Sequence, residues 1–196
     1  MSIRDFFPGA AHEVTGVVRR IDTEDLTRPT PCTDFALREL INHFIGTTAA
    51  LARVGRREAL DSEDPYGASQ NPSAGDWQTQ LATNLDQLAS VWAESQAWEG
   101  TVDMGGGDMP ATMIGEMALA EILLHGWDLA RASDQRLTVS DEVGKELLRS
   151  IEETGELGRQ MGAYGPEVAV DEKAGAFERA LAASGRDPGW SPNTAG

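Results

Sequence analysis

The sequence predicts an all-α protein: a four-helix bundle followed by a short helical extension. Apolar residues recur at intervals of three and four along four long stretches, as they do on the buried face of a helix. Almost no stretch alternates between apolar and polar residues as a strand does. The length of 196 residues suffices for one well-buried domain with an appendage. We expect the bundle to occupy residues 1–132, and residues 133–196 to form a helical extension packed on it rather than an independent domain.

The first two helices are predicted at residues 3–21 and 34–57. Pro8 indicates that the first helix begins or kinks there, because proline suits a first turn and breaks a helix interior. Residues 23–34 contain prolines and hydroxyl side chains without periodicity, and are predicted to be a loop. His12 lies roughly opposite the apolar stripe of the first helix, so we interpret it as a solvent-exposed histidine.

The third helix is predicted at residues 74–96, after a long polar loop, and its tryptophan-containing stripe is interpreted as core. A short extended piece with a glycine turn follows, and a proline then opens the fourth helix, residues 111–132, at its first turn. Two further helices are predicted in the extension, at residues 140–160 and 171–183, with Gly185 placed to end the second.

The fourth helix carries a pair of potential metal ligands, Glu121 and His125. They stand four residues apart, so both side chains leave the same face of the helix, about one turn apart. That face is also the apolar one, where a carboxylate and an imidazole cost free energy unless each finds a partner. An isolated Glu-x-x-x-His is most often a surface pair, but His43, near the apolar face of the second helix, offers a third ligand. A divalent cation would satisfy all three and keep open coordination positions, as catalytic zinc sites do.

The composition excludes some classes of function. The net charge is −16 at pH 7, so the chain lacks the basic patch that nucleic-acid binding requires. No apolar run approaches the roughly 20 residues of a membrane span, and the first residues do not resemble a secretory signal. We therefore expect a soluble, cytoplasmic protein.

Cys32 is the single cysteine, which excludes an intrachain disulfide. If His43 lies two turns inside its helix, helix geometry puts Cys32 roughly 10 Å or more from the metal. We therefore interpret Cys32 as a small, partly buried loop residue rather than as a nucleophile or ligand.

Three pieces of the sequence resemble one known family: TPCTDFALRELINHF at residues 30–44, AEILLHGWDLARA at 120–132, and GRDPGW at 185–190. The family is the metal-binding DinB-like family, in the branch related to mycothiol-dependent maleylpyruvate isomerase. The resemblance implies a DinB-like four-helix bundle that holds a divalent metal, often zinc, through one ligand on the second helix and two on the fourth. Carried over residue by residue, these metal ligands are His43, Glu121 and His125.

The resemblance also implies thiol chemistry. The isomerase uses mycothiol as a cofactor, and relatives transfer low-molecular-weight thiols to electrophiles. We therefore expect a metal-dependent thiol S-transferase or a mycothiol-dependent isomerase, with a small-molecule thiol and an electrophile as partners. A cation with open positions suits this chemistry, because it holds a thiol as thiolate near neutral pH. Zinc is the metal we expect, and Ni, Fe or Mn suit the same ligands.

Two alternatives to the thiol enzyme stay open: a non-catalytic metal-binding or stress-response module, and a metal-dependent hydrolase. A homodimer is also left open. Asp128, one turn after His125, either accepts a hydrogen bond from that imidazole behind the metal or is a surface acid or a partner of Arg131. Arg131 and Arg159 are the candidates for binding an anionic group of cofactor or substrate.

Overall fold

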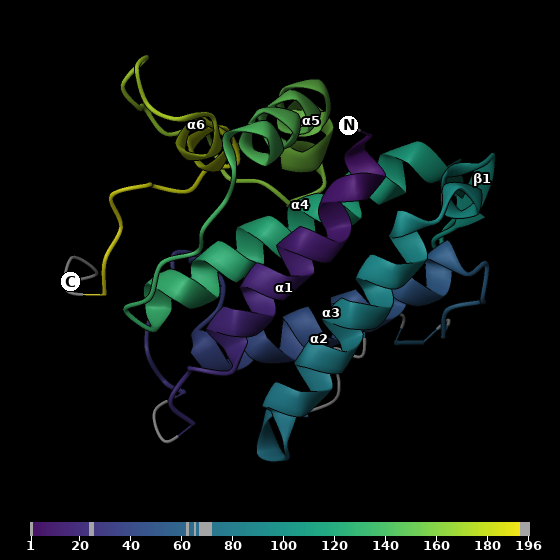
Figure 1. Cartoon of the computed structure of the whole chain (residues 1–196), viewed down its shortest axis with the longest axis horizontal. Coiled ribbons are helices and arrows are strands. Elements are labelled where there is room, and N and C mark those ends of the chain that lie inside the picture. Colours follow the sequence, from purple (N-terminus) through teal and green to yellow (C-terminus); the bar gives the residue numbers. More distant parts are fainter. Residues whose placement is uncertain (1, 24–25, 62, 65, 67–71, 193–196) are drawn as a thin grey trace. The chain divides into compact units, whose positions relative to one another are not determined.

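The computed structural model describes residues 2–23, 26–61, 63–64, 66 and 72–192, and within these ranges the predicted helical fold is confirmed (Figure 1). The chain divides into two compact units, Met1–Leu137 and Thr138–Gly196. The first unit contains α1 (Phe7–Val18), α2 (Leu37–Gly55), α3 (Trp77–Ala93) and α4 (Ala111–Ala132), and the second contains α5 (Asp141–Gln160) and α6 (Ala176–Ala183). Short 3₁₀ helices occur at η1 (Ile3–Phe6), η2 (Pro72–Ala74) and η3 (Ser95–Trp98).

The four helices of the first unit form a bundle around a common apolar core. Helices α1 and α2 each pack against both α3 and α4, so every helix of the bundle is flanked by two neighbours (Figure 1). Each helix thereby buries the apolar stripe that its sequence predicts. Burial of each large side chain contributes about 1.5–3 kcal/mol. The largest fully buried side chains include Phe7, Phe44, Leu85, Trp92 and Ile114.

Helix α4, which carries two of the predicted metal ligands, runs from Ala111 to Ala132 as predicted. Pro110 precedes it as the N-cap residue instead of occupying its first turn. Most residues of α4 are buried, which explains its nearly continuous apolar sequence. No helix in the ranges that the structure describes is long and apolar enough to cross a membrane.

Helices α1 and α3 are shorter than predicted. The first predicted helix begins as η1 and continues as α1, with Pro8 in its first turn, and it ends at Val18 rather than at residue 21. Helix α3 begins at Trp77 rather than at residue 74, because Asp76 accepts a hydrogen bond of 3.3 Å from the backbone N–H of Thr79 and caps the helix there.

Helix α2 begins at Leu37 rather than at residue 34. The residues before it form a closed loop, in which an isolated bridge pairs Pro29 with Ala36. The backbone N–H of Leu37 donates to the carbonyl oxygen of Arg28 at 2.9 Å. These contacts keep the chain out of the helix until residue 37 and fold the loop back on itself.

The extended piece between α3 and α4 is a two-stranded antiparallel hairpin, made of β1 (Thr101–Asp103) and β2 (Asp108–Pro110). The glycine turn that joins the strands was predicted, whereas their pairing was not. Gly105 and Gly107 have φ values of 81° and 141°, a region that favours glycine because it has no Cβ.

The second unit contains both predicted helices of the extension, which pack against each other. Ser140 caps α5 by accepting a hydrogen bond from the backbone N–H of Val143. Helix α6 begins at Ala176 rather than at residue 171. Asp171 Oδ1 accepts a hydrogen bond of 2.8 Å from the backbone N–H of Lys173, and such a local bond competes with helix formation. Gly185 follows the end of α6 with φ 90°, as a helix-terminating glycine does. That this unit packs on the bundle stays a prediction.

Candidate metal centre

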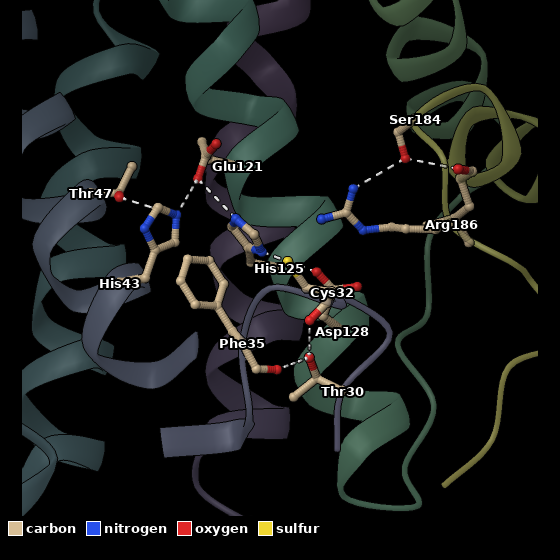
Figure 2. Close-up of polar contacts among 11 residues, drawn as sticks. Thr30, Cys32, Phe35, His43, Thr47, Glu121, His125, Asp128, Ser184 and Arg186 are labelled. Carbon is tan, nitrogen blue, oxygen red and sulfur yellow. Dashed lines mark hydrogen bonds and ion pairs between the residues drawn. The ribbon is translucent and has the colours of Figure 1, made fainter. Parts of the chain in front are cut away.

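Three predicted ligands, one from α2 and two from α4, converge in the first unit (Figure 2). Glu121 Oε2 lies 3.8 Å from His43 Nε2 and 3.4 Å from His125 Nε2. One donor atom of each residue lies within 4.8 Å of the other two. The two imidazole rings meet edge to face, with their centroids 5.0 Å apart. The structure therefore gathers two imidazoles and one carboxylate around a single point.

The three side chains differ in their exposure to solvent. His43 is 32% exposed, Glu121 22% and His125 9%. The His43 side chain is therefore the most exposed of the three, whereas the Glu121 Oε2 atom is itself buried, and a small molecule would approach the centre past His43. His125 forms its buried side.

Two side chains hold the His43 ring. Phe35, from the loop before α2, stacks on it with a centroid separation of 5.0 Å and an interplanar angle of 24°. Thr47 Oγ1, one turn further along α2, lies 3.5 Å from His43 Nε2. Stacking on one face and a hydroxyl at one edge restrict the rotation of the imidazole, so Nε2 stays directed toward Glu121. The role of Phe35 was not predicted, since nothing in the sequence pairs it with His43.

Asp128 holds the second imidazole. Its Oδ2 lies 3.0 Å from His125 Nδ1, and its side chain is 0% exposed. The interpretation of Asp128 as a surface acid is therefore wrong. An ionised carboxylate only accepts hydrogen bonds, so beside ionised Asp128 Nδ1 is the donor, and Nε2 is the nitrogen directed toward Glu121. Phe44 from α2 also contacts the His125 ring, with centroids 5.7 Å apart.

The loop before α2 forms a wall of the centre that sequence reasoning missed. Thr30 Oγ1 donates to the carbonyl oxygens of Cys32 and Phe35, at 2.9 and 2.7 Å, and so closes the loop (Figure 2). Cys32 thereby offers its sulfur within 4.8 Å of donor atoms of His125 and Asp128. The helix-axis estimate of roughly 10 Å or more from the metal did not anticipate this proximity to His125, because Cys32 lies on a loop that folds back toward α4.

Tyr66, from the polar region between α2 and α3, is electrostatically coupled to the centre. Burial raises the pKa of its phenol above the ordinary value, and the negative charge of Glu121 raises this pKa further. The sequence alone gave no spacing or periodicity that assigns Tyr66 to the centre.

The remaining candidate residues from the sequence lie outside the group of three predicted ligands. Arg131 is in the last turn of α4, and Arg159, in the second unit, forms an ion pair of 3.4 Å with Glu167. Their role in binding an anionic group stays a prediction. His12 is exposed, as predicted, and lines a polar cavity of about 670 Å³ between α1 and α3 that contains none of the three predicted ligands. Trp127 is buried.

The donor set has the chemistry and the spacing of a divalent-cation site. The two nitrogen–oxygen separations, 3.4 and 3.8 Å, exceed the usual hydrogen-bond range of about 2.7–3.2 Å. They are close to the roughly 3.3 Å that separates donors on one tetrahedral zinc ion with bonds of about 2.0–2.1 Å. Only small shifts of the side chains would therefore let His43, Glu121 and His125 share one cation.

The fold defines the class of this protein: it is a DinB-like helical bundle. A solved structure with this fold is the crystal structure of the mycothiol-dependent maleylpyruvate isomerase. The likeness has a TM-score of 0.60 at 17% sequence identity, and it covers 88% of this chain and 77% of that one. At this identity the likeness establishes the fold alone.

The family follows from the sequence of the bundle. Residues 7–130 match the family described as the mycothiol maleylpyruvate isomerase N-terminal domain, and the chain belongs to this family. Similar relatives are two proteins of Mycobacterium tuberculosis, Uncharacterized protein MT0763 and Uncharacterized protein Rv0738. Each is 25% identical over 132 residues, which make up 67% of this chain and 68% of the relative. The family resemblance seen in the sequence is thereby confirmed.

Proposed function

We propose that this chain is a mycothiol-dependent enzyme that binds a divalent cation through His43, Glu121 and His125 and adds a thiol to an electrophile. The observation that carries the proposal is the convergence of these three donor atoms within 4.8 Å. The description of the family, which names mycothiol and maleylpyruvate isomerase, supports a thiol as the substrate. The shared fold of the mycothiol-dependent maleylpyruvate isomerase is consistent with this proposal but, by itself, supports only the bundle architecture.

A bound cation would supply a positive charge with open coordination positions, at which a thiol loses its proton near neutral pH. His43 and His125 would hold the cation through Nε2, and Glu121 would hold it through Oε2 and reduce its net charge. We propose zinc as the resident metal, with Ni, Fe and Mn as the other metals that this donor set suits. Nitrogen and oxygen ligands alone do not separate these metals.

The residues around the donors prepare the site for this chemistry. Asp128 fixes the tautomer of His125, and Phe35 fixes the plane of His43, so the donors need little rearrangement when a ligand arrives. The Phe44 ring packs against His125 on the buried side of the centre, and electrostatic interactions are stronger where water is excluded. The partly exposed side at His43 leaves room for the thiol.

The proposed reaction starts with addition of the thiolate sulfur to the activated double bond of an electrophile such as maleylpyruvate. If the adduct is released, the protein is a thiol transferase. If the former double bond rotates and the thiol is then eliminated, the product is fumarylpyruvate and the protein is an isomerase. Arg131, in the same unit as the centre, is our candidate for binding a carboxylate of the electrophile, and we propose the cytoplasm as the compartment of the reaction.

A thiol-consumption assay with the metal-loaded protein tests the proposal. Mycothiol is mixed with maleylpyruvate or monochlorobimane, and the product is analysed to separate adduct from isomer. We expect the His43→Ala and His125→Ala variants to lose at least about a hundredfold in rate, because metal-assisted activation contributes several kcal/mol. His12→Ala makes the same chemical change at an exposed histidine outside the centre, and we expect it to leave the rate unchanged.

Two results would contradict the proposed enzyme. The first is a metal-loaded protein that neither binds nor consumes mycothiol with any of these electrophiles. The second is a His125→Ala variant whose melting temperature falls steeply while no thiol turnover is found with the wild type. That second result would instead support a non-catalytic module in which the metal cross-links the bundle helices.

A further inference from the structure

A second group of metal-ligating side chains shares His125 with the proposed centre. Cys32, His125 and Asp128 each offer a donor atom within 4.8 Å of the other two, and all three lie in the first unit. Cys32 comes from the closed loop before α2, and the other two residues come from α4. Figure 2 shows the Cys32 sulfur on the side of the His125 ring that faces Asp128. These donors are therefore directed at the Nδ1 edge of the imidazole, opposite the edge that faces Glu121.

We propose that Cys32, His125 and Asp128 form a second cation site, selective for thiophilic metals, which competes with the first centre for His125. Sulfur, imidazole nitrogen and carboxylate oxygen are all established ligands of zinc. Thiolate is the soft ligand among them and favours Zn²⁺ and Cu⁺ over Mg²⁺, Ca²⁺ and Mn²⁺. Only His125 is common to the two sets. In donor type, each set has one carboxylate, and the second has a sulfur where the first has the imidazole of His43.

The competition follows from the chemistry of imidazole. A neutral imidazole has one lone pair, so His125 serves the first centre through Nε2 or the second through Nδ1, and not both at once. A cation in the second site takes the place of the Nδ1 hydrogen that Asp128 otherwise accepts. The Nε2 nitrogen then carries the hydrogen and faces Glu121 Oε2 at 3.4 Å. The thiol proton of Cys32 passes to solvent.

The surroundings of the second set suit a bound cation. Asp128 is 0% exposed and His125 9% exposed, whereas Cys32 is half-buried and gives access from solvent. A bound cation would be a further partner for the buried Asp128 carboxylate, beside the His125 contact that it already makes. The Thr30 hydroxyl and the Pro29–Ala36 bridge fix the loop that carries Cys32, so the sulfur is held near its partners before a metal arrives.

Titration of the full chain with Cd²⁺, a soft ion that binds the ligands of Zn²⁺, tests this proposal. Cd²⁺–thiolate bonds absorb in the ultraviolet, and Cys32 is the only cysteine, so any such absorption reports on this residue. We expect the absorption in the wild type, its loss in Cys32→Ser, and its retention in His43→Ala, where the second set is intact. His12→Ala is the control for a histidine change outside both sets.

No thiolate absorption in Cd²⁺-saturated wild type, with Cys32 still reactive toward a thiol reagent, overturns the proposal. Absorption that disappears in His43→Ala also overturns it, because Cys32 would then be an added ligand of the first centre. Absorption that depends on protein concentration would show a cysteine shared between two chains and likewise excludes the site. Circular dichroism of each variant verifies that the helices are intact.

This site does not depend on the proposed enzyme. Failure of the thiol-consumption assay leaves the Cd²⁺ result for Cys32 unaffected, and absence of Cd²⁺–thiolate absorption leaves the first centre unaffected. If both sites are present, addition of Cd²⁺ to the Ni²⁺-loaded protein displaces Ni²⁺ from the wild type more readily than from Cys32→Ser. Equal displacement from the two proteins contradicts the competition for His125.

Discussion

Replacing Asp128 by asparagine tests how the proposed centre holds His125. The change keeps the size of a side chain that is 0% exposed and removes its charge, so it leaves the packing of α4 nearly intact. Asp128 Oδ2 lies 3.0 Å from His125 Nδ1, a distance at which the carboxylate accepts a charge-assisted hydrogen bond. Such a bond contributes about 1.5–3 kcal/mol, whereas a bond between neutral groups contributes about 0.5–1.5 kcal/mol.

The difference between the two bonds predicts the loss of metal affinity. A loss of about 1–1.5 kcal/mol corresponds to a roughly tenfold weaker binding constant, at about 1.4 kcal/mol per factor of ten. Asp128→Ala removes the acceptor altogether and leaves Nδ1 without its partner. We therefore expect a loss of roughly a hundredfold, the upper end of the range for residues that orient metal ligands.

Isothermal titration calorimetry with Ni²⁺ measures these affinities, because imidazole ligands suit Ni²⁺ and thiolate is not required. Asp134→Asn is the matched control, since Asp134 forms an exposed ion pair of 2.8 Å with Arg28. We expect the control to bind Ni²⁺ as the wild type does. Equal affinities for wild type and Asp128→Asn, with unchanged circular dichroism, would refute the role given to Asp128.

Two further predictions concern packing and electrostatics. A Cβ at Gly126 would lie 2.4 Å from Val14 Cγ2, so Gly126→Ala lowers the free energy of unfolding by about 1–2 kcal/mol after the gain in helix propensity. A Cβ at Gly16 would lie 3.6 Å from its nearest neighbour, so Gly16→Ala raises the free energy of unfolding by up to about 1 kcal/mol. Urea denaturation measures both changes, and midpoints that shift in the same direction for the two variants would contradict the packing argument. Glu121→Gln lowers the pKa of Tyr66, because the negative charge that disfavours its phenolate is gone. The titration of tyrosinate absorbance, with Tyr66→Phe to subtract the other tyrosine, measures this change, and an unchanged pKa would show that Tyr66 lies beyond the reach of Glu121.

Helix positions were predictable where a long apolar pattern and a proline define them. The largely apolar sequence of α4 has no internal proline between Pro110 and Ala132, and the bounds of the helix followed from the sequence. The start of α3 is set by the hydrogen bond from the Thr79 N–H to Asp76 and by Gly75, a poor helix former, and the apolar periodicity alone does not locate this cap. Small differences in free energy decide where such a helix begins, and the spacing of apolar residues does not reveal them.

The convergence of the three candidate ligands could be predicted, whereas their neighbours could not. Helical spacing brings Glu121 and His125 to one face, and the inward face of a bundle explains why His43 is near them. Phe35 and Cys32 reach the centre only because the Thr30 hydroxyl and the backbone bridge fold their loop back over α4. Contacts made by a folded loop have no periodic signature in the sequence, so this wall of the site required the structure.

Anomalous diffraction from crystals grown with Ni²⁺ tests the central claim most directly. The claim is that two helices deliver His43, Glu121 and His125 to one divalent cation. It predicts an anomalous peak about 2.0–2.2 Å from a nitrogen of each histidine and from a carboxylate oxygen of Glu121. A bound Ni²⁺ elsewhere on the chain, with these three side chains more than bonding distance from it, would contradict the claim.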